Sequence, residues 1–191
     1  MSLGFYQQED DSEDSIRFIT KLVADILVVL ILAIFLVQYM GMNYKVIGHS
    51  MEPTFQIGDT VLVDQIAYKV GRPHRFDVVL FQSRDDEEKF FMKRVIGLPG
   101  ETVQIQNGSV YINDRLLEAE DSLGTIHLAG IASSPVLLGK GEYFVIGDNS
   151  DSSEDSRFSN IGNIQQSDMI GKIWFRLEPF KRMGLITHRR K

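Results

Sequence analysis

The segment GHSMEPT, residues 48–54, holds a serine that could act as a nucleophile. Its glycine and proline predict a turn, and a turn can expose the hydroxyl of Ser50 and direct a backbone N–H toward a developing oxyanion. A serine hydroxyl attacks a carbonyl carbon only when a nearby base removes its proton. Because most serines in turns only form local hydrogen bonds, the chemistry depends on whether the chain supplies such a base.

Histidine is the usual base for a serine nucleophile. The chain has four histidines: His49, His74, His127 and His188. In an extended backbone His49 would point away from its neighbour Ser50, and the other three lie in polar stretches. A Ser-His-Asp triad therefore has no support in the surrounding sequence.

Lys93 is the second candidate base, and it lies in the segment KFFMKRVIG, residues 89–97. On a strand, Phe91, Lys93 and Val95 would share one face. Burial on an apolar face lowers the pKa of a lysine from about 10.4 toward the value of about 7 to 8 that suits a general base. From this stretch alone, an exposed lysine whose alkyl stem covers the strand is the commoner interpretation.

A third polar segment, GDNSDSSEDSR, occupies residues 147–157. Its acidic residues do not have the spacing of a calcium-binding loop, so we expect no metal here. Its hydroxyl groups and a carboxylate–arginine pair could instead hold a neutral amine and fix the loop. The chain has no cysteine, which excludes thiolate nucleophiles and cysteine metal sites, and we expect no cofactor.

The first element that could position these segments is the apolar run from Leu22 to Met40. Its nineteen residues span about 28 Å as a helix, close to the roughly 30 Å of a hydrocarbon core. The run is longer than the apolar part of a signal peptide, and no good cleavage site follows it, so we predict a retained membrane helix. Arg17 and Lys21 before the run, against Lys45 after it, favour a cytoplasmic N-terminus.

The predicted organisation is a cytoplasmic acidic tail at residues 1–21, a transmembrane helix at 22–40 and an extracytoplasmic domain at 41–191. The first fifteen residues carry five acidic side chains and no basic one, and such runs are most often solvated and without regular structure. We therefore expect a single-pass protein of the cell membrane. The net charge of −6 argues against a nucleic-acid partner.

From residue 44 onward the sequence is rich in short β-type runs separated by glycine and proline. Predicted strands cover residues 60–68, 77–82, 89–97, 102–106, 109–113 and 142–147. The Asn107-Gly108 pair predicts a type I′ hairpin, and residues 118–140 predict a loop-rich excursion. The fold class is therefore mainly β, with one N-terminal transmembrane helix followed by a domain of antiparallel strands.

In this order behind an apolar helix, the motifs SMEPT, GDTVLVD, KRVIGLPGE and GDNSDSSEDSR resemble bacterial type I signal peptidases. These are membrane-bound serine proteases that remove signal peptides from exported proteins, and the resemblance runs from about residue 44 to residue 183. It implies that Ser50 is the nucleophile and Lys93 its general base. It also implies that Ser153 hydrogen-bonds the lysine amine and that Asp155 and Arg157 form an ion pair that shapes the site.

The resemblance further implies a catalytic domain of coiled antiparallel β-sheets that works at the lipid bilayer on the signal peptides of exported preproteins. A shallow apolar pocket for small residues before the cut bond would be walled by Val46, Phe55 and Met92. Some family members have a hydroxyl residue two positions before the nucleophile, where this chain has Gly48. Backbone N–H groups such as that of Ser50 would then bind the oxyanion.

The short spacer between the predicted helix and Ser50 supports this assignment on physical grounds. Ten residues span at most about 33 to 36 Å, which keeps the hydroxyl near the height at which a membrane-inserted signal peptide presents its cleavage site. Two alternatives remain open. One is a LexA-type Ser/Lys self-cleaving protease, whose family begins with a DNA-binding helix-turn-helix. The other is a non-catalytic, membrane-anchored β module, which should expose an aromatic or arginine-rich patch.

Overall fold

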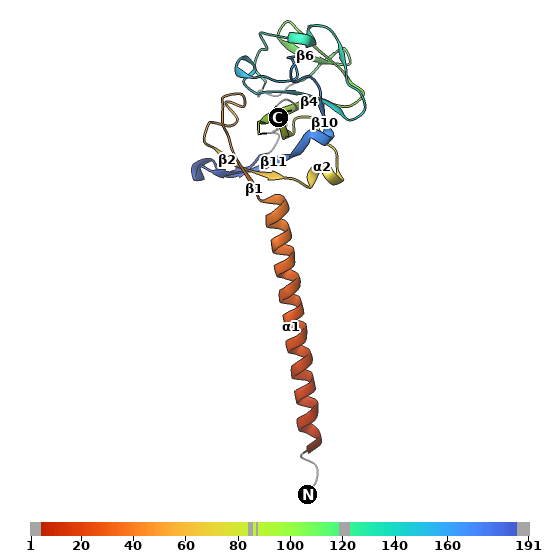
Figure 1. Cartoon of the computed structure of the whole chain (residues 1–191), viewed down its shortest axis with the longest axis vertical. Coiled ribbons are helices and arrows are strands. Elements are labelled where there is room, and N and C mark those ends of the chain that lie inside the picture. Colours follow the sequence, from red (N-terminus) through yellow and green to blue (C-terminus); the bar gives the residue numbers. More distant parts are fainter. Residues whose placement is uncertain (1–4, 84–85, 87, 119–122, 187–191) are drawn as a thin grey trace. The chain divides into compact units, whose positions relative to one another are not determined.

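The structure is a computed structural model that describes residues 5–83, 86, 88–118 and 123–186 (Figure 1). The chain forms two compact units, Met1–Tyr39 and Met40–Lys191. Within the described residues, the first unit is helical and the second contains the β-sheets. The predicted fold class, a mainly β domain after one apolar helix, is confirmed.

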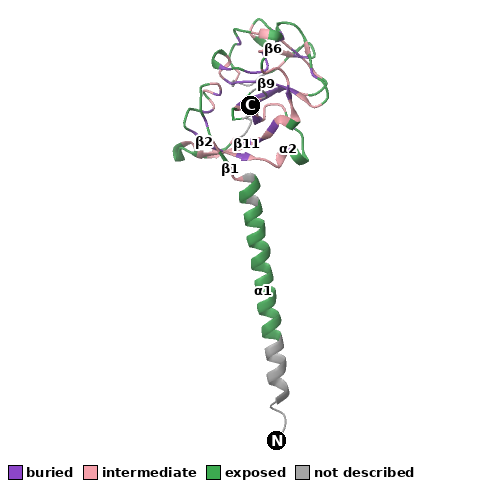
Figure 2. Cartoon of the chain, in the orientation of Figure 1, coloured by how far each residue is buried: buried purple, intermediate pink, exposed green. Residues whose placement is uncertain are grey.

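Helix α1 (Phe5–Met40) contains the apolar run. Within it, Asp14–Tyr39 is long and apolar enough to cross a membrane, with a mean hydropathy of 2.7 in its apolar window, and its described side chains are exposed (Figure 2). The expectation that the first fifteen residues lack regular structure is wrong for residues 5–15, which are helical. Once the apolar run is helical, each added residue gains a backbone hydrogen bond without a new nucleation cost, so the helix extends toward the N-terminus.

The larger sheet is antiparallel and has the strand order β1-β2-β11-β3-β4-β9-β10, with β12 paired to β11. Its strands are β1 (Met42–Lys45), β2 (Thr60–Asp64), β3 (Val78–Gln82), β4 (Phe90–Gly97), β9 (Glu142–Ile146), β10 (Ile164–Gln165), β11 (Met169–Glu178) and β12 (Gly184–Leu185). Strand β11 pairs with both β2 and β3. It joins the strand after the SMEPT segment to the β3–β4 pair, although the predicted strands did not include it.

The smaller sheet has the order β7-β6-β5-β8. Its strands are β5 (Thr102–Gln106), β6 (Ser109–Ile112), β7 (Arg115–Leu116) and β8 (Val136–Leu137). The turn between β5 and β6 has positive φ at Asn107 (51°) and at Gly108 (79°). Positive φ at both central residues is the requirement of a type I′ turn, so the predicted hairpin is confirmed.

Short helices occupy several connections. They are α2 (Ala67–Val70) and the 3₁₀ helices η1 (Gly130–Ser133), η2 (Ser150–Ser152), η3 (Gln166–Asp168) and η4 (Phe180–Arg182). The expected strand over residues 60–68 is too long, because β2 ends at Asp64. Asp64 Oδ1 accepts hydrogen bonds from the backbone N–H groups of Ile66 (2.9 Å) and Ala67 (3.1 Å), and this contact turns the chain into α2.

Two apolar clusters matter for the candidate site. One includes Ile96, Val103, Leu138 and Phe144, so it joins β4 and β9 of the larger sheet to the smaller sheet. The other includes Met51 and Phe55, together with side chains of β2, β3, β4 and β11. The segment that follows Ser50 is therefore anchored in the core of the larger sheet.

Gly97 lies where the two sheets meet, and it tests this packing. A Cβ atom there would approach Val103 Cγ2 to 2.5 Å and Leu138 Cδ1 to 2.6 Å. We expect Gly97→Ala to lower the free energy of unfolding by about 1 to 3 kcal/mol, measured by denaturant titration of the detergent-solubilised chain. At Gly184 an added Cβ would meet no atom within 4 Å, so Gly184→Ala is the control. Equal stability of the two variants would contradict the close packing at Gly97.

Candidate active site

The turn that carries Ser50 is held from several directions. Within the turn, the N–H of Glu52 donates to the carbonyl of His49 (3.1 Å) and the N–H of Phe55 donates to that of Met51 (2.8 Å). Met51 and Phe55 are almost fully buried, at 1% and 0% exposure. The guanidinium of Arg176, on β11, donates to the Thr54 carbonyl and stacks over the Phe55 ring. The turn is thus fixed while Ser50 itself stays partly exposed.

Strand β4 places Lys93 beside this serine. Lys93 Nζ lies 2.9 Å from Ser50 Oγ and 5.4 Å from the centroid of the Phe91 ring. The side chain is buried, with 3% of the residue exposed. The interpretation of Lys93 as an exposed lysine whose alkyl stem covers the strand is therefore wrong. Its side chain is buried between the strand and the turn that carries Ser50.

Burial lowers the pKa of Lys93 from its ordinary value of 10.5 to about 8. Loss of hydration is the largest cause, since an ammonium group is less stable away from water. The negative charges of Asp155 and Glu154 act against this shift, and the positive charges of Lys89 and Arg157 act with it. A large part of the Lys93 population is therefore neutral in mildly alkaline solution.

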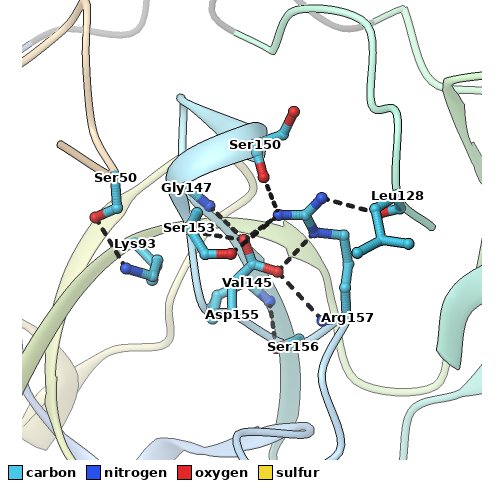
Figure 3. A network of polar contacts seen from close by, with 10 residues as sticks. All are labelled: Ser50, Lys93, Leu128, Val145, Gly147, Ser150, Ser153, Asp155, Ser156 and Arg157. Atoms are coloured by element: carbon cyan, nitrogen blue, oxygen red, sulfur yellow. Dashed lines mark hydrogen bonds and ion pairs between the residues drawn. The ribbon is translucent and has the colours of Figure 1, made fainter. Parts of the chain in front are cut away.

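The loop at residues 147–157 is organised around one buried carboxylate, that of Asp155 (Figure 3). Its two oxygens accept hydrogen bonds from Ser153 Oγ (2.6 Å), from the Gly147 N–H (3.1 Å) and from Nε and Nη2 of Arg157 (2.8 and 2.9 Å). Arg157 also donates to the carbonyl oxygens of Ser150 (2.6 Å) and Leu128 (2.9 Å). The predicted ion pair between Asp155 and Arg157 is present, with both side chains 0% exposed.

Ser153 lies in this network at 6% exposure. Within the described part of the chain, its hydroxyl donates to Asp155, and no hydrogen bond joins it to Lys93. The implied contact between Ser153 and the lysine amine therefore stays a prediction.

Gly147 brings the loop against the nucleophile, a role that the sequence analysis did not assign. A Cβ atom at Gly147 would lie 2.3 Å from Ser153 Oγ and 2.4 Å from the carbonyl oxygen of Ser50. Two residues later, the N–H of Asn149 donates to that same Ser50 carbonyl (3.0 Å). Only a glycine allows this approach without displacing Ser50 or Ser153.

A second buried ion pair, also missed, ties the base-bearing strand to the loop. Arg94 donates from Nε to Asp148 Oδ1 (2.7 Å) and from Nη2 to Asp148 Oδ2 (2.6 Å). Thr54 Oγ1 donates to the same Asp148 carboxylate (2.5 Å). Both residues lie in motifs that the sequence analysis identified, since Arg94 follows Lys93 and Asp148 lies at the start of the acidic loop. Their pairing joins distant segments, however, and cannot be derived from spacing.

An open cavity of about 450 Å³ contains Ser50 and Lys93. Apolar side chains form part of its wall: Tyr44, Ile47, Phe90 and Phe91. Charged side chains form its rim: Asp86, Glu88, Lys89 and Glu154. The expected pocket residues Val46, Phe55 and Met92 are buried at 2%, 0% and 5% exposure in one core cluster, and their role in substrate binding stays a prediction.

The described histidines make contacts away from Ser50 Oγ. His49 Nδ1 lies 3.0 Å from Glu52, His127 Nδ1 lies 3.0 Å from Asp151, and His74 Nδ1 lies 3.8 Å from Asp77. His188 lies outside the described residues. In the described ranges, no group of three histidine or acidic side chains could hold a metal ion.

Comparison with known proteins gives the class to which this chain belongs. Residues 19–178 match the family described as signal peptidase, peptidase S26. The chain is 39% identical over 155 residues to signal peptidase I V of Bacillus subtilis, across 75% of this chain and 89% of that protein. It is 34% identical over 153 residues to signal peptidase I of Bacillus caldolyticus, across 74% of this chain and 82% of that protein. A crystal structure of a signal peptidase I from Enterococcus faecalis is 32% identical, with a TM-score of 0.44 over 55% of this chain and 98% of that chain.

These matches place the chain among the serine peptidases, which are hydrolases. More narrowly, the chain belongs to the signal peptidase family, peptidase S26. The family resemblance inferred from the motifs is therefore confirmed. The alternative of a non-catalytic β module is wrong, and the family that matches is not that of LexA-type proteases.

The close approach at Gly147 generates a prediction. We expect Gly147→Ala to lower the rate of peptide cleavage by at least about tenfold, because the added methyl group would displace Ser50 or Ser153, and about 1 Å of misplacement is enough for such a loss. The rate is measured on the solubilised chain, with circular dichroism and thermal unfolding as checks on folding. Gly124→Ala, where a Cβ would meet no atom within 4 Å, is the control. A folded Gly147→Ala variant with the original rate would exclude this positioning role.

Proposed function

We propose that this protein is a membrane-anchored endopeptidase that removes signal peptides from exported preproteins, with Ser50 as nucleophile and Lys93 as general base. The observation that carries the proposal is the 2.9 Å contact between Ser50 Oγ and the amine of a buried lysine. Neutral Lys93 Nζ accepts the hydroxyl proton while Ser50 Oγ forms a bond to the scissile carbonyl carbon. The resulting ammonium then protonates the departing amine, and the acyl-enzyme is released by a water molecule that Lys93 deprotonates in turn.

The oxyanion of the tetrahedral intermediate needs hydrogen-bond donors. Gly48 has no side chain to supply one, so we assign the backbone N–H of Ser50 to this role. Gly48 itself has φ of +108°, a conformation that residues with a side chain rarely adopt. A residue with a side chain at position 48 would therefore strain this turn.

Ser153 is proposed to orient the lysine through its unused acceptor sites. Because its own proton is donated to Asp155, its oxygen is free to accept an N–H of Lys93. Such a bond would turn the nitrogen lone pair toward Ser50. Asp155 and Arg157 fix Ser153 from behind, and Arg157 also offsets the effect of the Asp155 charge on the pKa of Lys93.

The substrate is proposed to bind as an extended strand beside β4. Strand β9 pairs with β4 from Arg94 onward, while Phe90 and Phe91 line the cavity. A peptide added beside residues 90–92 would place every second side chain toward the core. Small residues one and three positions before the cut would then enter a shallow apolar pocket, which Val46, Phe55 and Met92 are proposed to support from the core beneath it.

Helix α1 is proposed to anchor the enzyme, with the N-terminus cytoplasmic and the catalytic domain on the outer side. A membrane-inserted signal peptide would present its cleavage site just beyond its own apolar segment. The ten residue steps from Met40 to Ser50 are short enough to hold the hydroxyl near that height, since they span at most about 33 to 36 Å. The lipid bilayer is thus a partner in substrate selection.

Substitutions at the proposed dyad test the mechanism. We expect Ser50→Ala, Lys93→Ala and Lys93→Arg each to reduce cleavage of a peptide with alanine at positions −1 and −3 by at least about 10³-fold. Arginine fails as a base because its guanidinium stays protonated. A variant without its four histidines should keep most of its rate. Substantial activity of folded Lys93→Arg, or its loss in the folded histidine-free chain, would mean that a different base operates.

The pH dependence follows from the lowered pKa of Lys93, about 8. The base is active in its neutral form, so kcat/KM should rise from neutral pH and level off above about pH 8 to 9. Below this range the rate should fall about tenfold for each pH unit, because the neutral fraction falls by that factor. A rate that is already constant from pH 6 upward would indicate a base other than Lys93.

A further inference from the structure

A charged pair at the rim of the Ser50–Lys93 cavity has no part in the proposed reaction. Lys89 Nζ lies 3.8 Å from Glu154 Oε2, and the two side chains are 52% and 61% exposed. Lys89 directly precedes β4, and its carbonyl accepts a hydrogen bond from the N–H of Ser83 (2.8 Å). Glu154 comes from the loop after β9. The pair therefore connects two segments that the sequence separates widely, at the edge of the cavity that both residues line.

Both residues lie close to the elements that carry the proposed base. Lys89 and Lys93 lie over the same aromatic ring, with Nζ atoms 4.7 and 5.4 Å from the centroid of Phe91. Glu154 lies between Ser153 and Asp155, the two residues whose side chains are hydrogen-bonded to each other beside the base. A paired cation and anion thus lie at the cavity that contains the buried amine.

We propose that Lys89 and Glu154 are positioning residues that act through Lys93, as two opposed charges that control its protonation from outside the site. The inference rests on the proposed role of Lys93 as base. Glu154 stabilises the ammonium form of Lys93, and Lys89 destabilises it. Because the signs are opposite, each charge offsets part of the effect of the other while both residues are present.

Other charged or titratable groups also face Lys93, and they separate into an inner and an outer set. The inner set is the buried pair of Asp155 and Arg157, which act in opposite directions on the pKa of Lys93. The outer set lines the cavity. Its members lie in the β3–β4 connection, in the loop after β9, in β1 and in the turn that carries Ser50: Asp86, Glu88, Lys89, Glu154, Tyr44 and His49. Burial raises the pKa of Tyr44, so its phenol stays neutral across the working range. Of the outer set, Glu154 and Lys89 act most strongly on the pKa of Lys93, which Glu154 raises and Lys89 lowers.

Substitutions in the inner pair and in the outer pair should have different effects on the fold of the site. Asp155 and Arg157 hold the loop together, so replacing either would disturb the fold of the site as well as its charge. The outer pair is exposed, and exposed pairs contribute little to stability. A substitution of Lys89 or Glu154 should therefore change the charge near Lys93 while the geometry of the dyad is preserved.

The test is the pH profile of kcat/KM for the full-length, detergent-solubilised chain on a peptide without titratable side chains. In Glu154→Gln the ammonium form loses a stabilising anion, so the acid limb should move to lower pH. In Lys89→Gln it loses a repelling cation, so the limb should move to higher pH. We expect shifts of about 0.3 to 0.5 pH units in opposite directions, since both charges are exposed and screened by solvent.

Four further variants make the test specific. The double variant Lys89→Gln/Glu154→Gln should return close to the original limb, and Lys89→Arg, which keeps the charge, should not move it. Glu118→Gln and Lys140→Gln remove the same charges from exposed residues outside the cavity, and they should leave the profile unchanged. The single-variant shifts should also grow as ionic strength is lowered, because screening weakens.

Several outcomes would overturn this inference. A rate change by the same factor at every pH would mean a structural or substrate-contact role, and shifts in one common direction would mean that the charges do not oppose each other. Shifts of equal size in the two control variants would mean an effect of net charge alone. The proposed function fails separately, through activity of Lys93→Arg. If that variant is inactive while Lys89 and Glu154 variants show no shift, only the present inference is lost.

Discussion

The constraint on which the candidate site depends is the removal of one amine from water. A pKa that falls from 10.5 to about 8 corresponds to roughly 3 kcal/mol acting against the charged form, at about 1.4 kcal/mol for each pH unit. That free energy comes from the fold, because a lysine on an exposed strand would keep its hydration and its proton. Everything that closes around Lys93 therefore contributes to reactivity, including the Ser50 turn, the Phe91 ring and the loop that begins at Gly147.

An unpaired carboxylate near Lys93 would raise the pKa of the amine again and so oppose the effect of desolvation. The Asp155 carboxylate accepts hydrogen bonds from Ser153 and from the Gly147 N–H, and its negative charge acts to raise the pKa of Lys93. Arg157 resolves this conflict, because it binds Asp155 through Nε and Nη2 and acts on the pKa of Lys93 in the opposite direction. Because of the ion pair, the Asp155 carboxylate can organise the loop while burial still lowers the pKa of Lys93.

The sequence predicted those features whose cause is local. The apolar run and the Asn107-Gly108 hairpin depend on residues close together in the chain, and both appear in the structure. Strand β11 was missed. Its buried and intermediate residues alternate from Met169 to Ile173, but the sequence does not show this alternation, because the apolar residues Met169 and Ile170 are adjacent. Its position between β2 and β3 could not have been derived, since order in a sheet is a property of tertiary packing.

The same distinction applies to the site. Residue type and setting identified Ser50 and left Lys93 ambiguous, because the strand sequence does not say which face is covered. The bonds from Arg94 and Thr54 to Asp148 join positions 54 and 94 residues apart, and no local pattern encodes such contacts.

The loop at residues 147–157 illustrates how an irregular segment can be precise enough for chemistry. Apart from the short helix η2, it lacks the repeating backbone hydrogen bonds of a sheet or helix, so its order depends on side chains. One guanidinium binds the carbonyl oxygens of Ser150 and Leu128 as well as Asp155, and the N–H of Asn149 binds the carbonyl of Ser50. Because these bonds converge on a few buried groups, the loss of one of them should weaken the others as well. The order of the loop, and with it the placement of Ser153, therefore rests on Asp155 and Arg157.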